Sequence, residues 1–88
     1  LAKTMTVTMP EGALHRLVLA ADSPAVGETV VSLNIRAKTG ASIVSVLRDG
    51  HVYRNVGPEL EFRIGDELVA LGDAHQVGAL KDLLGVTA

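Results

Sequence analysis

The apolar residues of this chain fall into short runs that turn-forming residues separate. Residues 14–21 are apolar apart from His15 and Arg16, and an Asp-Ser-Pro sequence follows them. This pattern predicts a strand that ends at a turn. Residues 67–71 form another strongly apolar run directly after a Gly-Asp pair, and they predict a second strand.

Between these two runs the sequence carries a strong hairpin signal. Residues 42–47 and 52–56 are rich in β-branched side chains, and Asp49-Gly50 stands between them. Asp-Gly readily adopts the positive φ angles that a tight hairpin turn requires. Because residues 42–47 are apolar on both faces, we predict that they form a central strand. A half-buried strand or extended segment should follow, whose apolar side consists of Leu60, Phe62 and Ile64.

Residues 26–38 show apolar side chains at helical spacing in two neighbouring stripes. One stripe consists of Val26, Val30, Leu33 and Ala37, and the other of Val31 and Ile35. We predict that this helix begins at Gly27-Glu28 and ends at Gly40. Two stripes on a short helix indicate that more than one of its faces is covered.

A second helix is predicted near the C-terminus. Asp73 followed by Gln76 has the spacing of a capping box, and Gly85 is placed to end the helix. The apolar residues expected to face inward are Val77, Leu80, Leu83 and Leu84.

The elements follow one another as strand, helix, hairpin, extended segment, strand and helix. We therefore predict an α+β fold with a small, mostly antiparallel sheet and two helices. Residues 14–85 should form one domain, preceded by a linker or edge-strand arm over 1–13 and followed by a tail over 86–88. Because the chain begins with Leu rather than Met, we expect it to be a fragment of a longer protein.

The composition excludes several classes of protein. Hydrophobic residues make up 48% of the 88 residues and charged residues 20%, which is typical of a folded domain. The chain has no cysteine, so it contains no disulfide, no thiolate zinc site and no cysteine nucleophile. No stretch approaches the roughly 20 apolar residues of a membrane-spanning helix. The net charge of −2 and the single Tyr and Phe argue against nucleic acid as a partner.

Residues that commonly perform catalysis are present but lie in unsuitable patterns. His15, His51 and His75 have no second histidine at the helical i, i+4 spacing, and His15 falls in a predicted strand, so we predict no metal site. Ser42 and Ser45 fall in a predicted strand and not in a G-x-S-x-G turn. Glycine-rich phosphate-binding loops are also absent from the sequence. We therefore predict that the chain is not an enzyme and holds no cofactor.

The end of the first predicted helix carries two basic residues beside apolar ones. Arg36 and Lys38 there interact favourably with the negative end of a helix dipole, which is one explanation of both charges. Alternatively, Val31 and Ile35 form the floor of a ligand notch in which a guanidinium binds phosphate or carboxylate. The residues alone leave both explanations open.

An ordered series of short motifs nevertheless resembles a known family. In sequence order the motifs are Val26-Gly27-Glu28-Thr29-Val30, Leu33-Asn34-Ile35-Arg36 with Gly40, Ile43 to Arg48 with Gly50, Pro58, and Gly65-Asp66-Glu67-Leu68-Val69-Ala70-Leu71-Gly72. The series is similar to the C-terminal domain of regulator-of-potassium-conductance modules, the TrkA-C type, over roughly residues 14–85. In that family the Gly-Asp turn is structural.

The resemblance implies a dimeric domain on the cytoplasmic face of the membrane. Domains of this type regulate potassium channels, potassium uptake systems, cation:proton antiporters and some anion transporters, and some bind cyclic di-AMP across the dimer interface. The ligand-binding residues that the resemblance implies are Val30, Val31, Ile35, Arg36, Ser42 and Pro58. Ser42 stands where binders often have asparagine, and it lacks an amide that reads an adenine edge.

We therefore expect a cytosolic regulatory and dimerisation domain of a membrane transporter for potassium transport or cation:proton antiport. Its partners would be a second copy, the transporter, and a small anionic ligand such as a cyclic dinucleotide. One alternative is a dimerisation module without a ligand, and another is an unrelated ferredoxin-like metabolite sensor. The stripe of Val31 and Ile35 also predicts a two-fold symmetric dimer, because it is surplus to one small core.

Overall fold

A computed structural model describes residues 14–86 of the chain. The strands are β1 (Leu14–Val18), β2 (Ser42–Arg48), β3 (His51–Tyr53) and β4 (Glu67–Leu71), and the helices are α1 (Ile35–Thr39) and α2 (Ala74–Leu84). The predicted α+β class and the antiparallel sheet with two helices are confirmed. The predicted arm or linker over 1–13 lies outside the described residues.

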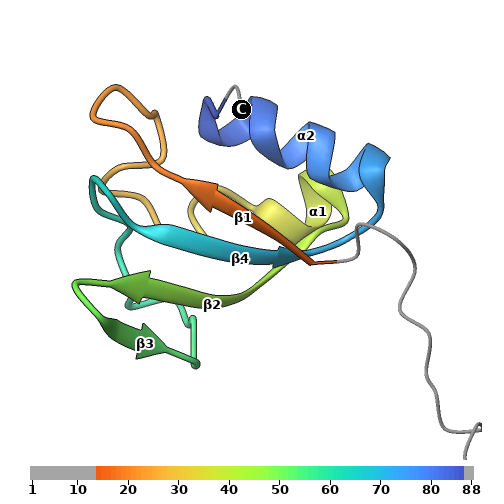
Figure 1. Ribbon diagram of the computed structural model, residues 1–88. Helices are drawn as coiled ribbons and strands as arrows, with labels where there is room; N and C mark the ends of the chain where they lie inside the picture. The colour runs from red at the N-terminus through yellow and green to blue at the C-terminus, as the bar shows by residue number, and fades with distance from the viewer. Residues whose placement is uncertain (1–13, 87–88) are drawn as a thin grey trace, which may run out of the picture.

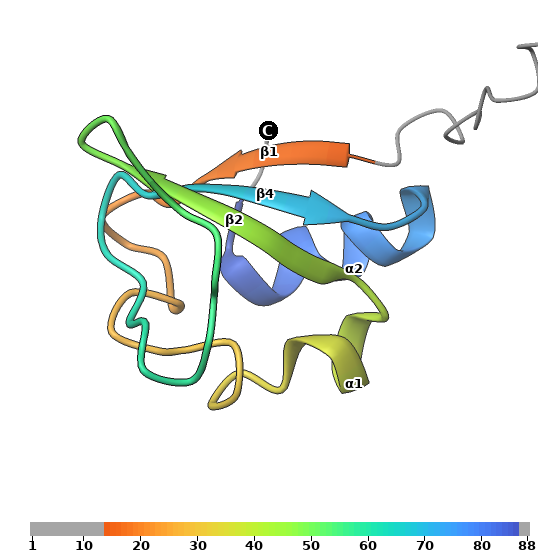
Figure 2. The same ribbon diagram turned by 90° about the horizontal axis from the view of Figure 1, so that it is seen from below.

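The four strands form one antiparallel sheet in the order β1-β4-β2-β3. β2 is an interior strand, as the apolar character of residues 42–47 predicts. Asp49 and Gly50 both have positive φ angles, 50° and 78°, and they form the predicted hairpin turn between β2 and β3. Both helices cover the same face of the sheet (Figures 1 and 2).

The core lies between this covered face and the helices. Its buried side chains come from the inner face of the sheet, from both helices and from the loops: Leu17, Leu19, Ala25, Ile35, Ala41, Val46, Phe62, Leu68, Ala70, Leu80 and Leu84. Inward residues alternate with outward ones along β4, as expected for a sheet with one covered face.

The predicted features of α2 are confirmed at both ends. The Asp73 carboxylate accepts a hydrogen bond from the Gln76 N–H at 2.8 Å, and the Gln76 side chain accepts one from the Asp73 N–H at 2.9 Å. This reciprocal pair is a capping box. Gly85 adopts φ 69° and ends the helix, and the Val86 N–H donates to the carbonyl of Lys81 at 2.9 Å.

The prediction of a continuous helix from Gly27-Glu28 to Gly40 is wrong over most of its length. Only five residues, Ile35–Thr39, are helical, and the chain before them consists of turns. The Leu33 N–H donates to the Thr29 carbonyl at 3.0 Å, which closes one helical turn. Asn34 then adopts φ 53° and ψ 46°, a left-handed conformation that a right-handed helix cannot continue through.

The hydrogen bonds around Asn34 show why the turn ends there. The Asn34 N–H donates to the Val31 carbonyl at 3.0 Å, and the Ile35 N–H donates to the Val30 carbonyl at 3.2 Å. These are the two bonds of a Schellman motif, in which a left-handed residue closes a helical turn. The helical spacing of apolar residues over 26–38 therefore comes from two short helical segments in succession, a single turn that ends at Asn34 and then α1. The predicted stop at Gly40, which has φ 80°, is confirmed.

The segment between β3 and β4 contains no regular strand. Phe62 is fully buried, and its N–H and carbonyl bond to the Glu28 carbonyl and the Gly27 N–H, each at 2.8 Å. The prediction of an extended segment with Phe62 inward is confirmed, but Ile64 is 61% exposed and its inward placement was wrong. Figure 2 shows this segment beside the turns that precede α1.

Candidate functional site

A pocket of about 370 Å³ lies where α1 and the turn before it meet the start of β2. Its lining combines apolar side chains with three polar ones: Val30, Val31, Asn34, Ile35, Arg36, Ser42, Ile43 and Val56. Ligand pockets in proteins commonly have volumes of roughly 300–1,000 Å³ and a mostly apolar lining with few polar groups. This pocket has both properties.

The structure places five of the six predicted ligand-binding residues in this lining: Val30, Val31, Ile35, Arg36 and Ser42. Pro58 is exposed and does not line the pocket. A binding role for all six residues remains a prediction. Asn34, Ile43 and Val56 line the pocket and were not predicted. The left-handed turn brings Asn34 there, the path of the chain after β3 brings Val56, and Ile43 follows Ser42 on β2.

The two residues of the predicted surplus stripe have different environments. Ile35 is 1% exposed and belongs to the core of the single chain, so its assignment to a surplus face was wrong. Val31 is 63% exposed at the rim of the pocket. Turning the chain at Asn34 directs Ile35 inward and leaves Val31 outside.

Among the described residues that line the pocket, only Arg36 carries a charge. Its side chain is exposed, and neither of the ion pairs found within residues 14–86 involves it. A guanidinium without a carboxylate partner is free to bind an anion with two parallel hydrogen bonds. Lys38 lies on the same helix but does not line the pocket. The pocket therefore has an apolar floor with one cation at its side.

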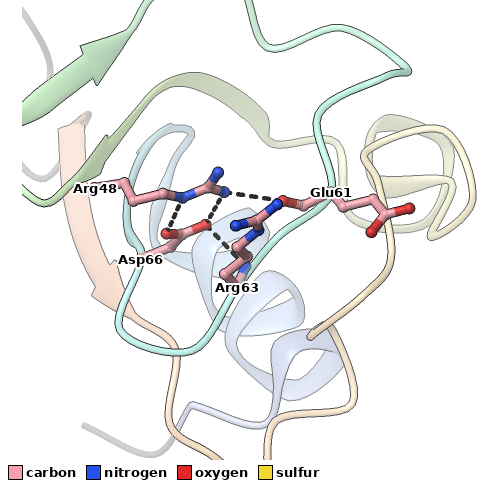
Figure 3. Close-up of polar contacts among 4 residues, drawn as sticks. All are labelled: Arg48, Glu61, Arg63 and Asp66. Carbon is pink, nitrogen blue, oxygen red and sulfur yellow. Dashed lines mark hydrogen bonds and ion pairs between the residues drawn. The ribbon is translucent and has the colours of Figure 1, made fainter.

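A second polar cluster connects the β2–β3 hairpin to the loop before β4 (Figure 3). The Arg48 guanidinium donates from Nε and Nη2 to the two carboxylate oxygens of Asp66, at 2.8 and 2.7 Å. It also donates to the Glu61 carbonyl at 2.9 Å, and the Arg63 N–H donates to Asp66 at 2.9 Å. Asp66 is only 1% exposed.

The electrostatics of this cluster favour the ionised pair. Burial raises the pKa of Asp66, but the hydrogen bonds from Arg48 and the Arg63 N–H outweigh it and lower the pKa below its ordinary value. The hydrogen bond to Asp66 raises the pKa of Arg48. The Arg48 guanidinium also lies 5.1 Å from the centre of the Tyr53 ring. Both groups are bonded within the protein, so we interpret the cluster as structural.

The histidines do not gather into a site in the described part of the chain. His15 lies on β1, His51 begins β3 and contacts Tyr53, and His75 lies in the first turn of α2. Within residues 14–86 no three His, Asp or Glu side chains are grouped as ligands for a metal ion. Over the same residues, no helix combines the length and apolar character needed to cross a membrane.

Comparison with known proteins places this geometry among related domains. The family model of the TrkA-C domain matches residues 14–85. A search of curated proteins finds no match. The RCK_C domain dimer of S. agalactiae BusR in complex with c-di-AMP has a TM-score of 0.73 and 27% identity, over 81% of this chain and 93% of that chain.

Longer proteins contain the same fold. S. agalactiae BusR in complex with its busAB-promotor DNA has a TM-score of 0.74 and 26% identity, over 92% of this chain and 40% of that one. The GsuK channel has a TM-score of 0.71 and 28% identity, over 81% of this chain and 13% of its own.

The RCK C domain of the potassium transport protein KtrA, in complex with c-di-AMP, has the same fold. Its TM-score is 0.72 and its identity is 21%, over 80% of both chains. At this identity the likeness shows the fold alone.

Proposed function

Because the chain belongs to the TrkA-C domain family, we propose that it is a regulatory domain that binds a cyclic dinucleotide between two copies of itself. On this proposal the domain acts in the cytoplasm on a membrane transporter for potassium or another cation. Family membership also rules out the alternative of an unrelated ferredoxin-like sensor. We propose binding rather than catalysis as its biochemical activity.

The observation that carries the proposal is that Arg36, which forms no ion pair with any other residue of 14–86, lies beside the apolar floor of the pocket. A cyclic dinucleotide combines two phosphates, which need cations, with two flat bases, which need apolar surfaces. A two-fold dimer of this chain offers each of these twice. An RCK_C domain dimer of BusR, which shares 27% identity with this chain, is found in complex with c-di-AMP.

Regulation follows if the ligand prefers one arrangement of the two copies. A ligand shifts an equilibrium between two states only by its difference in affinity for them. A ligand that bridges two pockets has such a difference, because a change in the dimer geometry moves one arginine relative to the other. The attached transporter would then respond to the same shift.

The BusR structures support a second possibility, in which the domain is part of a DNA-binding regulator instead of a transporter. BusR is found with promoter DNA, and this chain spans 40% of that BusR chain. The prediction that nucleic acid is no partner rests on the charge of these 88 residues and does not extend to a longer protein that contains them. We propose that, on a DNA-binding protein, the domain would again contribute the ligand site and not the DNA contact.

Calorimetric titration of cyclic di-AMP into the wild type, Arg36→Ala and Lys38→Ala tests the ligand site. Arg36→Ala should weaken binding by at least about tenfold, or about 1.4 kcal/mol, because charge-assisted hydrogen bonds are lost. Lys38→Ala is the matched control on the same helix and should have less effect, since Lys38 does not line the pocket. If the wild type binds no cyclic dinucleotide, the dimerisation module without a ligand becomes the better interpretation. Equal binding by wild type and Arg36→Ala would place the ligand elsewhere.

A further inference from the structure

Asn34 has an unusual backbone conformation for a residue with a side chain. Among residues 14–86 only Asn34 and Asp49 combine a side chain with positive φ, at 53° and 50°. Asp49 is explained by the hairpin turn that it forms with Gly50. At Asn34 a glycine would satisfy the Schellman motif with less strain, because glycine populates the left-handed region freely. The backbone therefore does not require an asparagine.

The side chain of Asn34 also has no structural task within the described chain. Asn34 occupies the N-cap position of α1, yet its side chain makes no capping hydrogen bond. The residue is exposed and lines the pocket between Val31 and Arg36 in sequence. Its amide thus presents one donor and one acceptor group to whatever fills the pocket.

A primary amide matches one type of purine edge. Adenine presents an N–H₂ donor and the N7 acceptor side by side, and an asparagine amide binds both groups at once. Guanine presents two acceptors at the same edge, O6 and N7, and the carbonyl of an amide would face an acceptor there. Arg36 has only donors, and Ser42 has a single hydroxyl. Of the lining residues that lie within 14–86, only Asn34 has a side-chain amide.

We infer that Asn34 is a specificity-determining residue that reads the adenine edge of a bound cyclic dinucleotide. This inference rests on the proposed function. It assigns base recognition to the left-handed turn before α1 and leaves phosphate recognition to Arg36. Ser42, which is shorter than asparagine and has no amide, is then compatible with an adenine ligand, because the amide comes from a different element of the same pocket.

Titration of cyclic di-AMP and cyclic di-GMP into the wild type, Asn34→Gly and Asn34→Asp tests the inference. Asn34→Gly removes the amide and keeps the left-handed backbone at no strain. It should weaken cyclic di-AMP binding by at least about fivefold, the lower bound for a bidentate base contact. The preference for cyclic di-AMP over cyclic di-GMP should fall toward equality. Asn34→Asp keeps the shape but loses the donor, and it should bind cyclic di-AMP no better than Asn34→Gly.

Asn55→Gly is the matched control, because Asn55 is an exposed asparagine outside the pocket lining. It should leave both the affinity and the base preference unchanged. An Asn34→Gly variant with unchanged affinity and unchanged preference would overturn the role of Asn34, while the wild-type binding would still support the proposed function. A wild type that binds neither dinucleotide would overturn both. A purely structural role of Asn34 predicts no change in base preference, so the preference separates the two roles.

Discussion

The two helices lie on the same face of the sheet but are formed by different kinds of interaction. α2 has 11 residues, a complete capping box at its start and a left-handed glycine at its end. α1 has five residues, and the asparagine before it makes no capping bond with its side chain. α2 contributes Leu80 and Leu84 to the core, and α1 contributes Ile35 to the core and one wall of the pocket.

The difference separates the framework of the domain from its proposed ligand site. Capping, apolar spacing and a terminal glycine all favour the same conformation in α2. Around α1 these signals disagree, because apolar spacing favours a continuous helix and the left-handed Asn34 interrupts it. Proteins commonly depart from locally consistent structure at functional positions. We therefore expect substitutions in the α2 framework to reduce stability and those around α1 to reduce binding.

The largest loss of stability should follow truncation of Leu84 at the end of α2. Leu84 is fully buried, and truncation of a buried leucine to alanine leaves a cavity that costs about 2–5 kcal/mol. Leu84→Ala should thus lower the free energy of unfolding by about 3 kcal/mol in urea denaturation. Val31→Ala is the matched control at an exposed apolar residue and should change it by less than about 0.5 kcal/mol. Equal losses in the two variants would contradict the division between framework and site.

The next largest loss of stability should come from Asp66→Asn in the Arg48–Asp66 cluster. The substitution weakens charge-assisted hydrogen bonds to a buried group, so it should lower the free energy of unfolding by about 2 kcal/mol. Thermal unfolding measured near neutral pH checks this loss. Arg16 is the comparison, since its side chain is 75% exposed in its ion pair with Glu67, and Arg16→Ala should cost at most about 1 kcal/mol.

The same carboxyl predicts how stability depends on pH. The pKa of Asp66 in the folded protein lies below its ordinary value of 3.8, so its unfolded form binds a proton first as the pH falls. The stabilisation is therefore complete above this value and is lost as the pH falls through the folded pKa. Unfolding curves between pH 7 and pH 2 should show a smaller acid-induced loss in Asp66→Asn than in the wild type. Parallel curves for the two proteins would show that Asp66 does not contribute to acid sensitivity.

The capping box should contribute less than either buried group. Asp73→Ala removes the side-chain acceptor for the Gln76 N–H, and loss of an N-cap costs about 1 kcal/mol. The unfolding midpoint should fall accordingly, while cyclic di-AMP affinity stays within about twofold of the wild-type value. Asp82→Ala on the same helix is the control, because Asp82 is exposed and contributes only its backbone carbonyl, which the substitution keeps, to the cap at Gly85. A loss of binding in Asp73→Ala without a loss of stability would reverse the roles assigned to the two helices.

The sequence predicts the parts of this fold that local signals determine. The Asp49-Gly50 hairpin, the interior strand β2 and the capping box of α2 each depend on residues within a few positions of one another. The backbone bonds of Phe62 to Glu28 and Gly27 join segments more than thirty residues apart, and no short motif encodes them. The exposure of Ile64 also depends on how this segment packs against distant parts of the chain, so the alternation of apolar and polar residues did not predict it.

The candidate site was predictable in part, and chiefly through resemblance. Arg36 and Val31 fall in the pocket lining as the resemblance implies, whereas Pro58 does not. Asn34 was missed because helical spacing over 26–38 conceals a left-handed residue. Asparagine is among the few residues that tolerate this conformation, which is the only local signal that the sequence offers.

The smallest effect on unfolding should come from Val31, where we expect a change in assembly instead. Val31 is 63% exposed at the rim of the pocket, where a second copy would cover it if the ligand binds between two copies. Val31→Ser should leave the free energy of unfolding within about 0.5 kcal/mol. In a two-fold dimer the substitution occurs twice, and burial of a valine contributes about 1.5 kcal/mol, so dissociation should become easier by more than about tenfold. Sedimentation at tens of micromolar, a concentration on the order of common weak dimers, should show a dimer for the wild type. For Val31→Ser it should show a larger share of monomer.

Val52→Ser is the matched control, since Val52 is an exposed valine on β3 outside the pocket lining. A wild type that sediments only as a monomer, or a Val52→Ser variant that dissociates as readily as Val31→Ser, would contradict a dimer formed through the α1 side of the domain.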